Sequence, residues 1–419
     1  MLAAYRDFIN VPGTKGLIVA SAIARLPQAM FAIGIITLLA HKTGQYWLAG
    51  SVAGTFTLAN ALFAPKISKL VDLYGQYKIL PVVTACSTGM MLGLIVAIYL
   101  EASITLLFLL AALAGLMPSM PAMTRARWMH MFQEKHRLHT AFSVDTVLTE
   151  LAYIIGPPLA IGLSTHFYAE TGPLMATLLL VFGVTAVLAQ RNSEPQVVND
   201  SASSANSVLF RPGIRTMVFS LLAMGGIGGA IDVAVVAYAN EQGWPGSASF
   251  ILAAYALGSM IAGLLFGAIK LSLPIEKQFL LGILVTGLTA ILPLFSSSVY
   301  ALAVLLFFAG VSFAPTMVVT MNLGAILIPA SRATEGFTWM TTGLSVGVAI
   351  GAAVSGVFVD IYGARAGFGG AIGAGLIMVM VVLSGFGSLR KTVANSAVGA
   401  DAIANPGVPV GEDVIAPGR

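Results

Sequence analysis

Stretches of apolar residues, each long enough to cross a bilayer, recur along almost the whole of this chain. A membrane-spanning helix needs about 20 such residues. Twelve stretches meet this length, at residues 16–40, 48–65, 79–99, 103–124, 140–165, 172–190, 216–239, 248–269, 278–297, 300–328, 334–359 and 366–388. Only 9% of the 419 residues are charged, whereas soluble domains carry about a quarter. The pattern excludes a soluble protein and predicts an all-α polytopic membrane protein.

The basic residues are strongly biased to one side of the predicted membrane. All but three of the 21 Lys and Arg residues fall on the side of the N-terminus, the exceptions being Lys42, Arg365 and Arg25, which lies inside the first stretch. Because cytoplasmic loops are enriched in Lys and Arg, we expect both termini in the cytoplasm of a multi-pass protein of the cell membrane. This bias also explains the net charge of +4, so no nucleic-acid partner is expected.

One long polar segment divides the stretches into two sets of six. Residues 191–215 are rich in Ser, Asn and Pro and form a predicted cytoplasmic linker between an N-terminal six-helix bundle, 1–190, and a C-terminal one, 216–389. Residues 390–419 lack periodicity and are expected to form a disordered cytoplasmic tail. An offset of 195 residues superposes the pairs Gly115/Gly310, Phe142/Phe337, Gly156/Gly351 and Gly172/Gly367. The two sets therefore read as parallel repeats.

The loop after the second stretch, KISKLVDLYGQYK, resembles the Gly-x-x-x-Asp-Arg-x-Gly-Arg-Lys/Arg signature of the major facilitator superfamily. Asp72 and Gly75 fall at the matching spacing, and Lys78 adds a late positive charge. A carboxylate can accept hydrogen bonds at a helix N-terminus, so Asp72 is expected to latch a cytoplasmic gate, while Gly75 permits a tight turn. The departures from the signature are Ser68, Leu73 and Gln76. With two basic positions missing, the latch should be weaker or built differently.

The fifth stretch carries a second resemblance. Its segment AYIIGPPLA is similar to the Gly-x-x-x-Gly-Pro-x-x-Gly-Gly signature of the superfamily's antiporters, and Gly156 and Pro157 match it. Small residues at such positions allow neighbouring helices to approach closely in a membrane. The positions that depart from the signature are Ala152, Ala160 and Ile161.

These resemblances extend over residues 10–390 and imply the superfamily's fold, two pseudo-symmetric six-helix bundles that work by alternating access. The second signature implies the drug/proton-antiporter-like efflux branch, with proton-coupled export of a small organic molecule. A proton-linked uptake permease for a sugar, amino acid or organic acid is the alternative within the fold. A non-transporting membrane sensor or lipid-handling protein is the alternative from another class. The expected partners are the lipid bilayer, protons and a small-molecule substrate, and the chain is expected to be a monomer.

Three carboxylates lie inside apolar stretches, where an ionised side chain is costly unless it is paired, protonated or facing water. We predict Glu150 as the proton-coupling group, with Asp145 second and Asp232 a further candidate, because a carboxylate removed from water binds a proton more readily. The alternative for each is a structural carboxylate that holds helices together. Asp145 and Gly156, eleven residues apart, share one helix face, and Glu150 points about 140° away from Asp145. Arg25 lies as deep as Glu150, and the resemblance to the superfamily implies that the first and fifth stretches are neighbours, so an Arg25–Glu150 pair is expected.

Polar side chains predicted to lie near the middle of the membrane are candidates for lining a central cavity. They are Arg25, Gln28, Asn60, Tyr255, Ser259, Thr341, Thr342 and Ser345. The chain has no Walker loop, Gly-x-Ser-x-Gly elbow or His-Glu-x-x-His helix, and the spacing of His130, His136 and His139 suits no zinc site. We therefore expect neither an enzyme nor a metal or other cofactor, and the proton gradient as the energy source.

Overall fold

The structure, a computed structural model, describes residues 2–43, 46–197, 207–244, 247–269 and 271–404. All the regular secondary structure in these ranges is helical, as the sequence predicts. Short 3-10 helices join some of the longer α-helices, at Arg191–Ser193, Val208–Phe210, Leu292–Phe295 and Ala330–Arg332.

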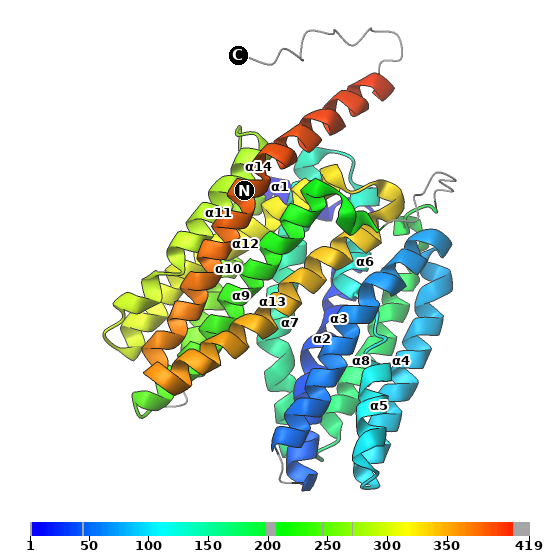
Figure 1. The fold of residues 1–419 in the computed structure, drawn as a ribbon. Helices are drawn as coiled ribbons and strands as arrows, with labels where there is room; N and C mark the ends of the chain where they lie inside the picture. Colours follow the sequence, from blue (N-terminus) through cyan, green and yellow to red (C-terminus); the bar gives the residue numbers. More distant parts are fainter. Residues whose placement is uncertain (1, 44–45, 198–206, 245–246, 270, 405–419) are drawn as a thin grey trace.

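The α-helices form two groups (Figure 1). The first group contains α1 (Leu2–Ile9), α2 (Thr14–Thr43), α3 (Tyr46–Tyr74), α4 (Gln76–Tyr99), α5 (Ile104–Ala114), α6 (Met120–Met131), α7 (Lys135–His166) and α8 (Thr171–Leu188). The second group contains α9 (Pro212–Glu241), α10 (Ser247–Gly267), α11 (Ile275–Thr289), α12 (Val299–Leu327), α13 (Ala333–Tyr362) and α14 (Ala364–Ala404). In the first group α2 packs on α7 and α8, and in the second α9 packs on α13 and α14.

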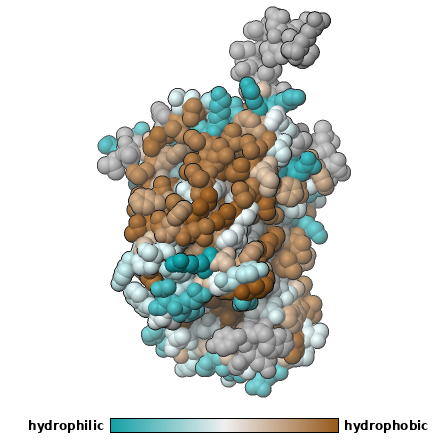
Figure 2. All heavy atoms as spheres, turned by 60° about the vertical axis from the view of Figure 1, so that its left-hand side comes forward, coloured by the Kyte–Doolittle hydropathy of each residue, from teal (hydrophilic) through white to brown (hydrophobic). Residues whose placement is uncertain are grey.

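Eleven helices of the described residues are long and apolar enough to cross a membrane, and α5 is a shorter apolar helix. On the face that Figure 2 shows, hydrophobic side chains form a broad band, with hydrophilic ones gathered above and below it. Since lipid is the solvent that such a band requires, the arrangement is that of a multi-pass membrane protein.

The predicted stretch 103–124 is not one continuous helix. It contains α5, a non-helical segment at 115–119 and the start of α6. The break needs hydrogen-bond partners for its carbonyls, and these come from other helices: the Asn60 amide of α3 donates to Gly115 O at 3.1 Å and Met117 O at 2.8 Å, and the Ser87 hydroxyl of α4 donates to Ala114 O at 2.7 Å. The predicted span is therefore completely interrupted here, and tertiary contacts stabilise the interruption.

The ends of the second group differ from the predicted boundaries. Helix α9 begins at Pro212, inside the predicted linker 191–215, with proline in the first turn where its missing N–H is not needed. Helix α14 continues past residue 390, the predicted start of a disordered tail, to Ala404. The prediction of irregular chain is thus wrong for 390–404, while residues 405–419 lie outside the described part of the chain.

Glycines related by the 195-residue offset make equivalent contacts. A Cβ on Gly156 of α7 would lie 2.8 Å from Ala29 Cβ of α2, and a Cβ on Gly351 of α13 would lie 2.7 Å from Gly226 Cα of α9. Both distances are too short for a side chain, so both helix pairs require glycine to pack this closely. The internal repeat read from the sequence is therefore also a repeat of helix packing.

Helix α1 and the C-terminal end of α14 lie at the same end of the molecule, which we call the terminal side (Figure 1). The two groups of helices contact each other on this side, where α13 packs on α3 and α6, and α7 packs on α10 and α12. Toward the other end, the opposite side, the two groups diverge (Figure 1).

Candidate functional site

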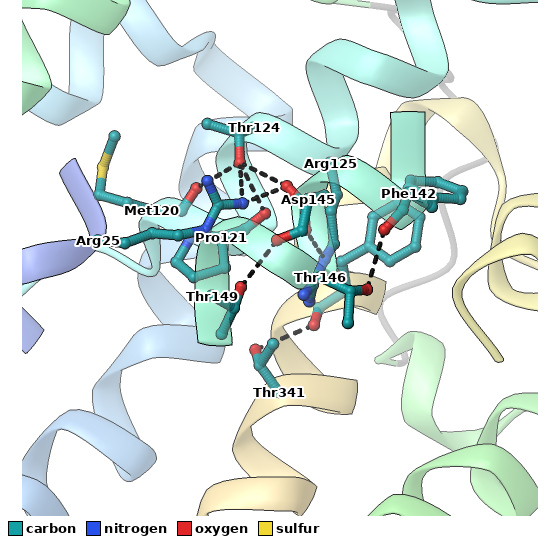
Figure 3. Close-up of polar contacts among 11 residues, drawn as sticks. Arg25, Met120, Pro121, Thr124, Arg125, Phe142, Asp145, Thr146, Thr149 and Thr341 are labelled. Carbon is teal, nitrogen blue, oxygen red and sulfur yellow. Dashed lines mark hydrogen bonds and ion pairs between the residues drawn. The ribbon is translucent and has the colours of Figure 1, made fainter. Parts of the chain in front are cut away.

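A buried cluster of charges joins three helices of the first group. The Asp145 carboxylate of α7 accepts hydrogen bonds from Arg25 Nη2 of α2 and, at 2.7 Å, from Arg125 Nε of α6 (Figure 3). Arg25 Nη2 also donates to the Thr124 hydroxyl at 2.9 Å. None of the three charged side chains is more than 2% exposed. The cluster links α2, α6 and α7 and contains two positive charges and one negative charge.

This cluster corrects one expectation from the sequence. Arg25 faces the interior as expected, but its partner is Asp145, so the predicted Arg25–Glu150 pair is wrong. Arg125 was not among the predicted site residues, yet it forms the second ion pair of Asp145. Breaking a buried ion pair of this kind is strongly destabilising, because it leaves a buried charge without its partner. The geometry therefore favours a structural role for Asp145, while its predicted role in proton coupling stays untested.

Asp72, at the end of α3, contacts the N-terminus of α13 in the second group. Its carboxylate accepts the backbone N–H of Thr334 at 3.0 Å and of Glu335 at 2.7 Å. A negative charge here also interacts favourably with the helix dipole. One turn earlier on α3, the buried Ser68 hydroxyl lies 2.7 Å from the Thr338 hydroxyl. We call these contacts the Asp72 latch. The sequence analysis expected Asp72 to accept hydrogen bonds at a helix N-terminus, and the structure contains this contact. Ser68 occupies the first glycine position of the family signature.

A second set of contacts joins the start of α7 to the end of α10. His139 Nε2 lies 3.0 Å from Phe266 O, the Thr140 hydroxyl donates to Gly267 O at 3.0 Å, and the Ser143 hydroxyl donates to Gly263 O. Phe266 O and Gly267 O belong to the last turn of α10, whose carbonyls have no partner within that helix, and Gly263 O lies one turn earlier. We call these three contacts the Thr140 latch.

Helix α1 adds to the Thr140 latch. The Tyr5 hydroxyl donates to Leu264 O at 2.5 Å and lies 3.3 Å from the Ser143 hydroxyl. Phe8 is fully buried, and its ring lies 5.7 Å from that of Trp128 and 5.3 Å from that of Phe132. The short N-terminal helix is thus packed on the first group and bonded to the second.

Equivalent positions of the internal repeat form the two latches. The residues related by the 195-residue offset are Asp72/Gly267, Ser68/Gly263, Thr140/Glu335 and Ser143/Thr338. In the Asp72 latch a side chain accepts from the backbone N–H of Glu335 at a helix N-terminus. In the Thr140 latch a side chain donates to the backbone carbonyl of Gly267 at a helix C-terminus. At equivalent positions of the repeat, the side chain of the first group is therefore a hydrogen-bond acceptor in one latch and a donor in the other.

Glu150 also joins the two groups of helices. Its contact lies farther from the terminal side than either latch. It is the sixteenth of the 32 residues of α7, and its Oε1 accepts a hydrogen bond of 3.1 Å from the Ser259 hydroxyl of α10. Ser259 is fully buried and Glu150 is half-buried. The positions related to Glu150 and Ser259 by the repeat are Ser345 and Ala64. The pair is therefore asymmetric, with no second carboxylate at the equivalent position.

Tyr255 connects Glu150 with the third predicted carboxylate. The Tyr255 hydroxyl, one turn from Ser259 on α10, lies within electrostatic range of both Glu150 and Asp232. The Tyr255 ring packs against Phe313 of α12 at 6.1 Å. Asp232 itself is exposed on α9. The structure thus brings four of the predicted site residues, Glu150, Ser259, Tyr255 and Asp232, into one region between the two groups.

The remaining predicted cavity residues divide into two sets. The first set is half-buried and consists of Gln28 on α2 and Thr342 and Ser345 on α13. Asn60 instead supports the break between α5 and α6, and the Thr341 hydroxyl donates to Phe337 O at 3.1 Å and Thr338 O at 3.0 Å in its own helix. The donors of these last two side chains are therefore already satisfied by protein carbonyls.

The packing residues of the predicted motifs lie where close approach or a turn requires them. Gly75 has φ +91°, a conformation that favours glycine, and begins α4. Pro157 follows Gly156 inside the continuous helix α7, and Lys78 is exposed. The Glu194 carboxylate accepts the Tyr77 N–H at 2.9 Å, so the N-terminus of α4 also has a carboxylate partner from another segment.

Arg127 is a buried cation that the sequence analysis did not single out. Its Nε donates to Gln76 Oε1 at 2.7 Å, and its Nη1 donates to Gln190 O and to the Ser193 hydroxyl, each at 2.7 Å. It lies on α6, outside the candidate spans, and burial lowers the pKa of its guanidinium to about 10 against the opposing effect of Glu194. Gln76 occupies a basic position of the family signature, so Arg127 brings positive charge to a place where the loop itself lacks it.

Most of the chain also matches a known family. The profile of the Major Facilitator Superfamily matches two segments, residues 17–273 and 217–401. No curated protein matches the chain by sequence. Within the described residues, no group of three or more His, Cys, Asp and Glu side chains could hold a metal ion.

Solved structures share the fold at low sequence identity. A bacterial homologue of the iron transporter ferroportin, in an outward-facing state, has a TM-score of 0.74 at 14% identity, covering 89% of this chain and 99% of that one. A human organic anion transporter has a TM-score of 0.66 at 12% identity, covering 88% and 98%. The fucose:proton symporter of E. coli has a TM-score of 0.64 at 13% identity, covering 88% and 98%. At such identities, the likeness shows the fold alone.

Proposed function

The chain belongs to the Major Facilitator Superfamily and has the fold of its multi-pass membrane transporters, and from this premise we propose that it exports a small organic molecule across the cell membrane in exchange for protons. In this proposal the terminal side faces the cytoplasm, as the bias of Lys and Arg supports. The structure then represents a state closed toward the cytoplasm by the Asp72 latch and the Thr140 latch. No cofactor takes part, and the proton gradient supplies the energy.

The observation that carries this proposal is the bond between Glu150 and Ser259. Glu150 is a half-buried carboxylate at the middle of α7, and within the described residues its hydrogen-bond partner in the second group is a neutral hydroxyl at 3.1 Å. In contrast, Asp145 already has two arginine partners. A carboxylate with little compensation in a low-dielectric region is suited to bind and release a proton. Its position between the two groups allows the protonation state to influence whether they separate.

The direction of coupling follows from the strength of this bond. When Glu150 is ionised, the Ser259 hydroxyl donates a charge-assisted hydrogen bond across the two groups, which is about twice as strong as a neutral one. Protonation of Glu150 from the opposite side weakens this bond and favours opening toward the cytoplasm. The proton leaves there, and substrate binding favours the return. One proton thus moves inward as one substrate cycle moves outward, which is antiport.

Asp232 is the second candidate for coupling or for binding a substrate charge. It is exposed on α9 and shares the electrostatic environment of Tyr255 with Glu150. A cationic substrate placed between two carboxylates would be bound more tightly when both are ionised. The drug/proton-antiporter-like branch is therefore our proposal for this chain within the superfamily.

The test is proton flux in proteoliposomes that contain a pH-sensitive dye, measured with pools of cationic, neutral and anionic compounds. We expect cationic compounds to drive proton movement opposite to their own, and we expect Glu150→Gln to abolish this movement while retaining a hydrogen bond to Ser259. Ser345→Ala, at the equivalent position of the second repeat and in the predicted cavity, removes no titratable group. It can change the substrate affinity but should retain coupled proton movement. Coupled transport by Glu150→Gln would refute the assignment of Glu150.

The same experiment separates the alternatives. Proton and solute moving in the same direction would favour the proton-linked uptake permease for a sugar, amino acid or organic acid. No solute movement under any imposed pH gradient, from a folded protein, would favour the non-transporting sensor or lipid-handling protein.

A further inference from the structure

A cavity of about 800 Å³ lies on the terminal side, between the two groups of helices. The end of α6, the turn into α7 and the first residues of α7 form one wall. The connection from α10 to α11 and the last turns of α12 form the other wall. Its volume falls within the range of roughly 300–1,000 Å³ that is usual for small-molecule pockets. Glu150, Ser259, Tyr255 and Asp232 are not among its lining residues, so it is distinct from the proposed transport site.

The ionisable side chains that line this cavity are all basic. Among its described lining residues none is Asp or Glu, while His130, Lys135, His136 and His139 contribute to it. His130 and Lys135 are exposed at the α6–α7 turn. Lys135 supplies a positive charge and imidazole N–H groups can donate hydrogen bonds to an anion, while no lining carboxylate opposes one, so the lining favours an anion over a cation.

His139 fixes the floor of the cavity. Its Nε2 lies 3.0 Å from Phe266 O, and its Nδ1 lies 3.2 Å from Asn322 Nδ2, which also donates to Val318 O at 2.8 Å. Because an amide nitrogen can only donate, Nδ1 accepts and the Nε2 proton is donated to Phe266 O. The floor is thus a neutral imidazole bonded to α10 and α12, and the positive charge of the site lies at its rim.

Most of the remaining lining is apolar. Met129, Phe132 and Leu138 come from the first group, and Leu271 and Ile326 come from the second. A ligand that fills the cavity would bury an apolar body among these side chains, while its charged group lies near the basic rim. The lining thus suits an amphiphilic anion better than a small inorganic one.

We propose that this cavity binds a small amphiphilic anion, and that the bound anion stabilises the closure on the terminal side. Residues of both groups form the walls, so the site is intact only while the groups are in contact there. A ligand that binds one conformation and not the other shifts the population toward the first. The anion would therefore inhibit opening on this side. Its source is either a soluble amphiphile or the headgroup region of an anionic lipid.

The test uses 1-anilinonaphthalene-8-sulfonate as an amphiphilic anion and N-phenyl-1-naphthylamine as its uncharged counterpart. Fluorescence titrations are made on the purified full-length protein in phosphatidylcholine nanodiscs, with empty nanodiscs subtracted. We expect one saturable site for the anion, and we expect the double variant His130→Glu, Lys135→Glu to weaken its affinity tenfold or more with little change for the uncharged probe. Both positions are exposed, so these substitutions should not prevent folding.

Two control variants sharpen this result. Lys277→Glu reverses an exposed charge on α11 that does not line the cavity, and it should leave the affinity unchanged. Ala325→Trp fills the cavity from α12 and should weaken both probes. Unchanged anion affinity in the double variant, or an equal loss in Lys277→Glu, would overturn the proposal because binding would then reflect the general surface.

A separate experiment tests whether anion binding depends on the conformation of the protein. Asp72→Asn weakens the latch without touching the cavity lining, so the anion affinity should fall several-fold as the closed fraction falls. The same affinity in Asp72→Asn would overturn the link between this site and closure. Adding phosphatidylglycerol to the nanodiscs distinguishes the sources, because a lipid occupant would compete with the probe in the wild type but not in the double variant.

Discussion

Phe142 of α7 and Phe337 of α13 occupy equivalent positions in the two repeats, and their rings contact each other, with 5.7 Å between the ring centroids and an interplanar angle of 67°. A residue that meets its own repeat equivalent lies beside the pseudo-two-fold axis that relates the two groups. Both side chains are fully buried. The terminal-side closure is therefore built around this pair, with the Asp72 latch and the Thr140 latch at the repeat-related contacts.

Replacing Phe142 by alanine and replacing Phe337 by alanine should lower the free energy of unfolding by similar amounts. Removing one buried ring costs about 3–5 kcal/mol in a well-packed core. Because the two rings contact each other, the double variant Phe142→Ala, Phe337→Ala should cost less than the two single changes combined. The free energy of unfolding, measured by denaturant titration in mixed micelles, tests this. Strictly additive losses would show that the two rings act independently.

Asp72→Asn should increase access to the interface from the terminal side. The variant loses a charge-assisted acceptor for two backbone N–H groups, a loss of about 1–3 kcal/mol. Ser68→Cys, in a Cys86→Ser background, reports on access because Ser68 is buried in the closed state. Its maleimide labelling rate should rise several-fold when Asp72→Asn is added. An unchanged rate would show that the Thr140 latch alone keeps this side closed.

Asp145→Asn and Glu150→Gln should differ sharply in their effects on stability. Asp145→Asn leaves Arg25 and Arg125 buried without their carboxylate, which should destabilise the protein by about 3–5 kcal/mol. Glu150→Gln keeps its shape and its Ser259 partner, so its melting temperature should stay close to that of the wild type. Thermal unfolding followed by size-exclusion chromatography compares the two. A stable Asp145→Asn variant with lost proton coupling would instead make Asp145 the coupling residue.

Gly156→Leu should arrest transport by separating α7 from α2. A Cβ at this position would already lie 2.8 Å from Ala29 Cβ, so a larger side chain must push the helices apart. Gly162→Leu on the same helix is the matched control, since a Cβ there meets no atom within 4 Å. Proteoliposome transport should be lost in the first variant and kept in the second. Equal activity of both would show that the close approach is not required for the transport cycle.

The fold could be predicted from the sequence because its main determinants are local. The length of the apolar stretches, the polar linker and the glycine repeat each follow from composition and spacing. The interruption at 115–119 could not be predicted to its full extent. It depends on Asn60 and Ser87, which donate to its carbonyls from other helices, and only the assembled structure brings them there.

The candidate site was predicted in part, and the error at Arg25 has a clear cause. Depth along a helix placed Arg25 level with Glu150 but did not give the direction in which either side chain points. Gly156 packs on α2, and Asp145 shares the Gly156 face of α7, so the face that carries Asp145 is the one that meets Arg25. The helical spacing shows that Asp145 and Gly156 share a face of α7, but it does not show which helix packs against that face. The side chains of the Thr140 latch had no such signal, because their partners are backbone carbonyls.

The use of backbone groups in the latches has a consequence for how this gene can vary. In both latches most partners in the second group are backbone groups, and those at Thr334, Glu335 and Phe266 are ones that almost any residue type supplies. The exceptions are the Thr338 hydroxyl and Gly267, where a Cβ would clash with Ser143. The first group contributes the side chains of Asp72 and Thr140, which few residue types can replace. Substitutions that remove a latch side chain are therefore most damaging at Asp72 and Thr140, in the first half of the chain. At Thr334, Glu335 and Phe266 a changed side chain leaves the bonded backbone group in place.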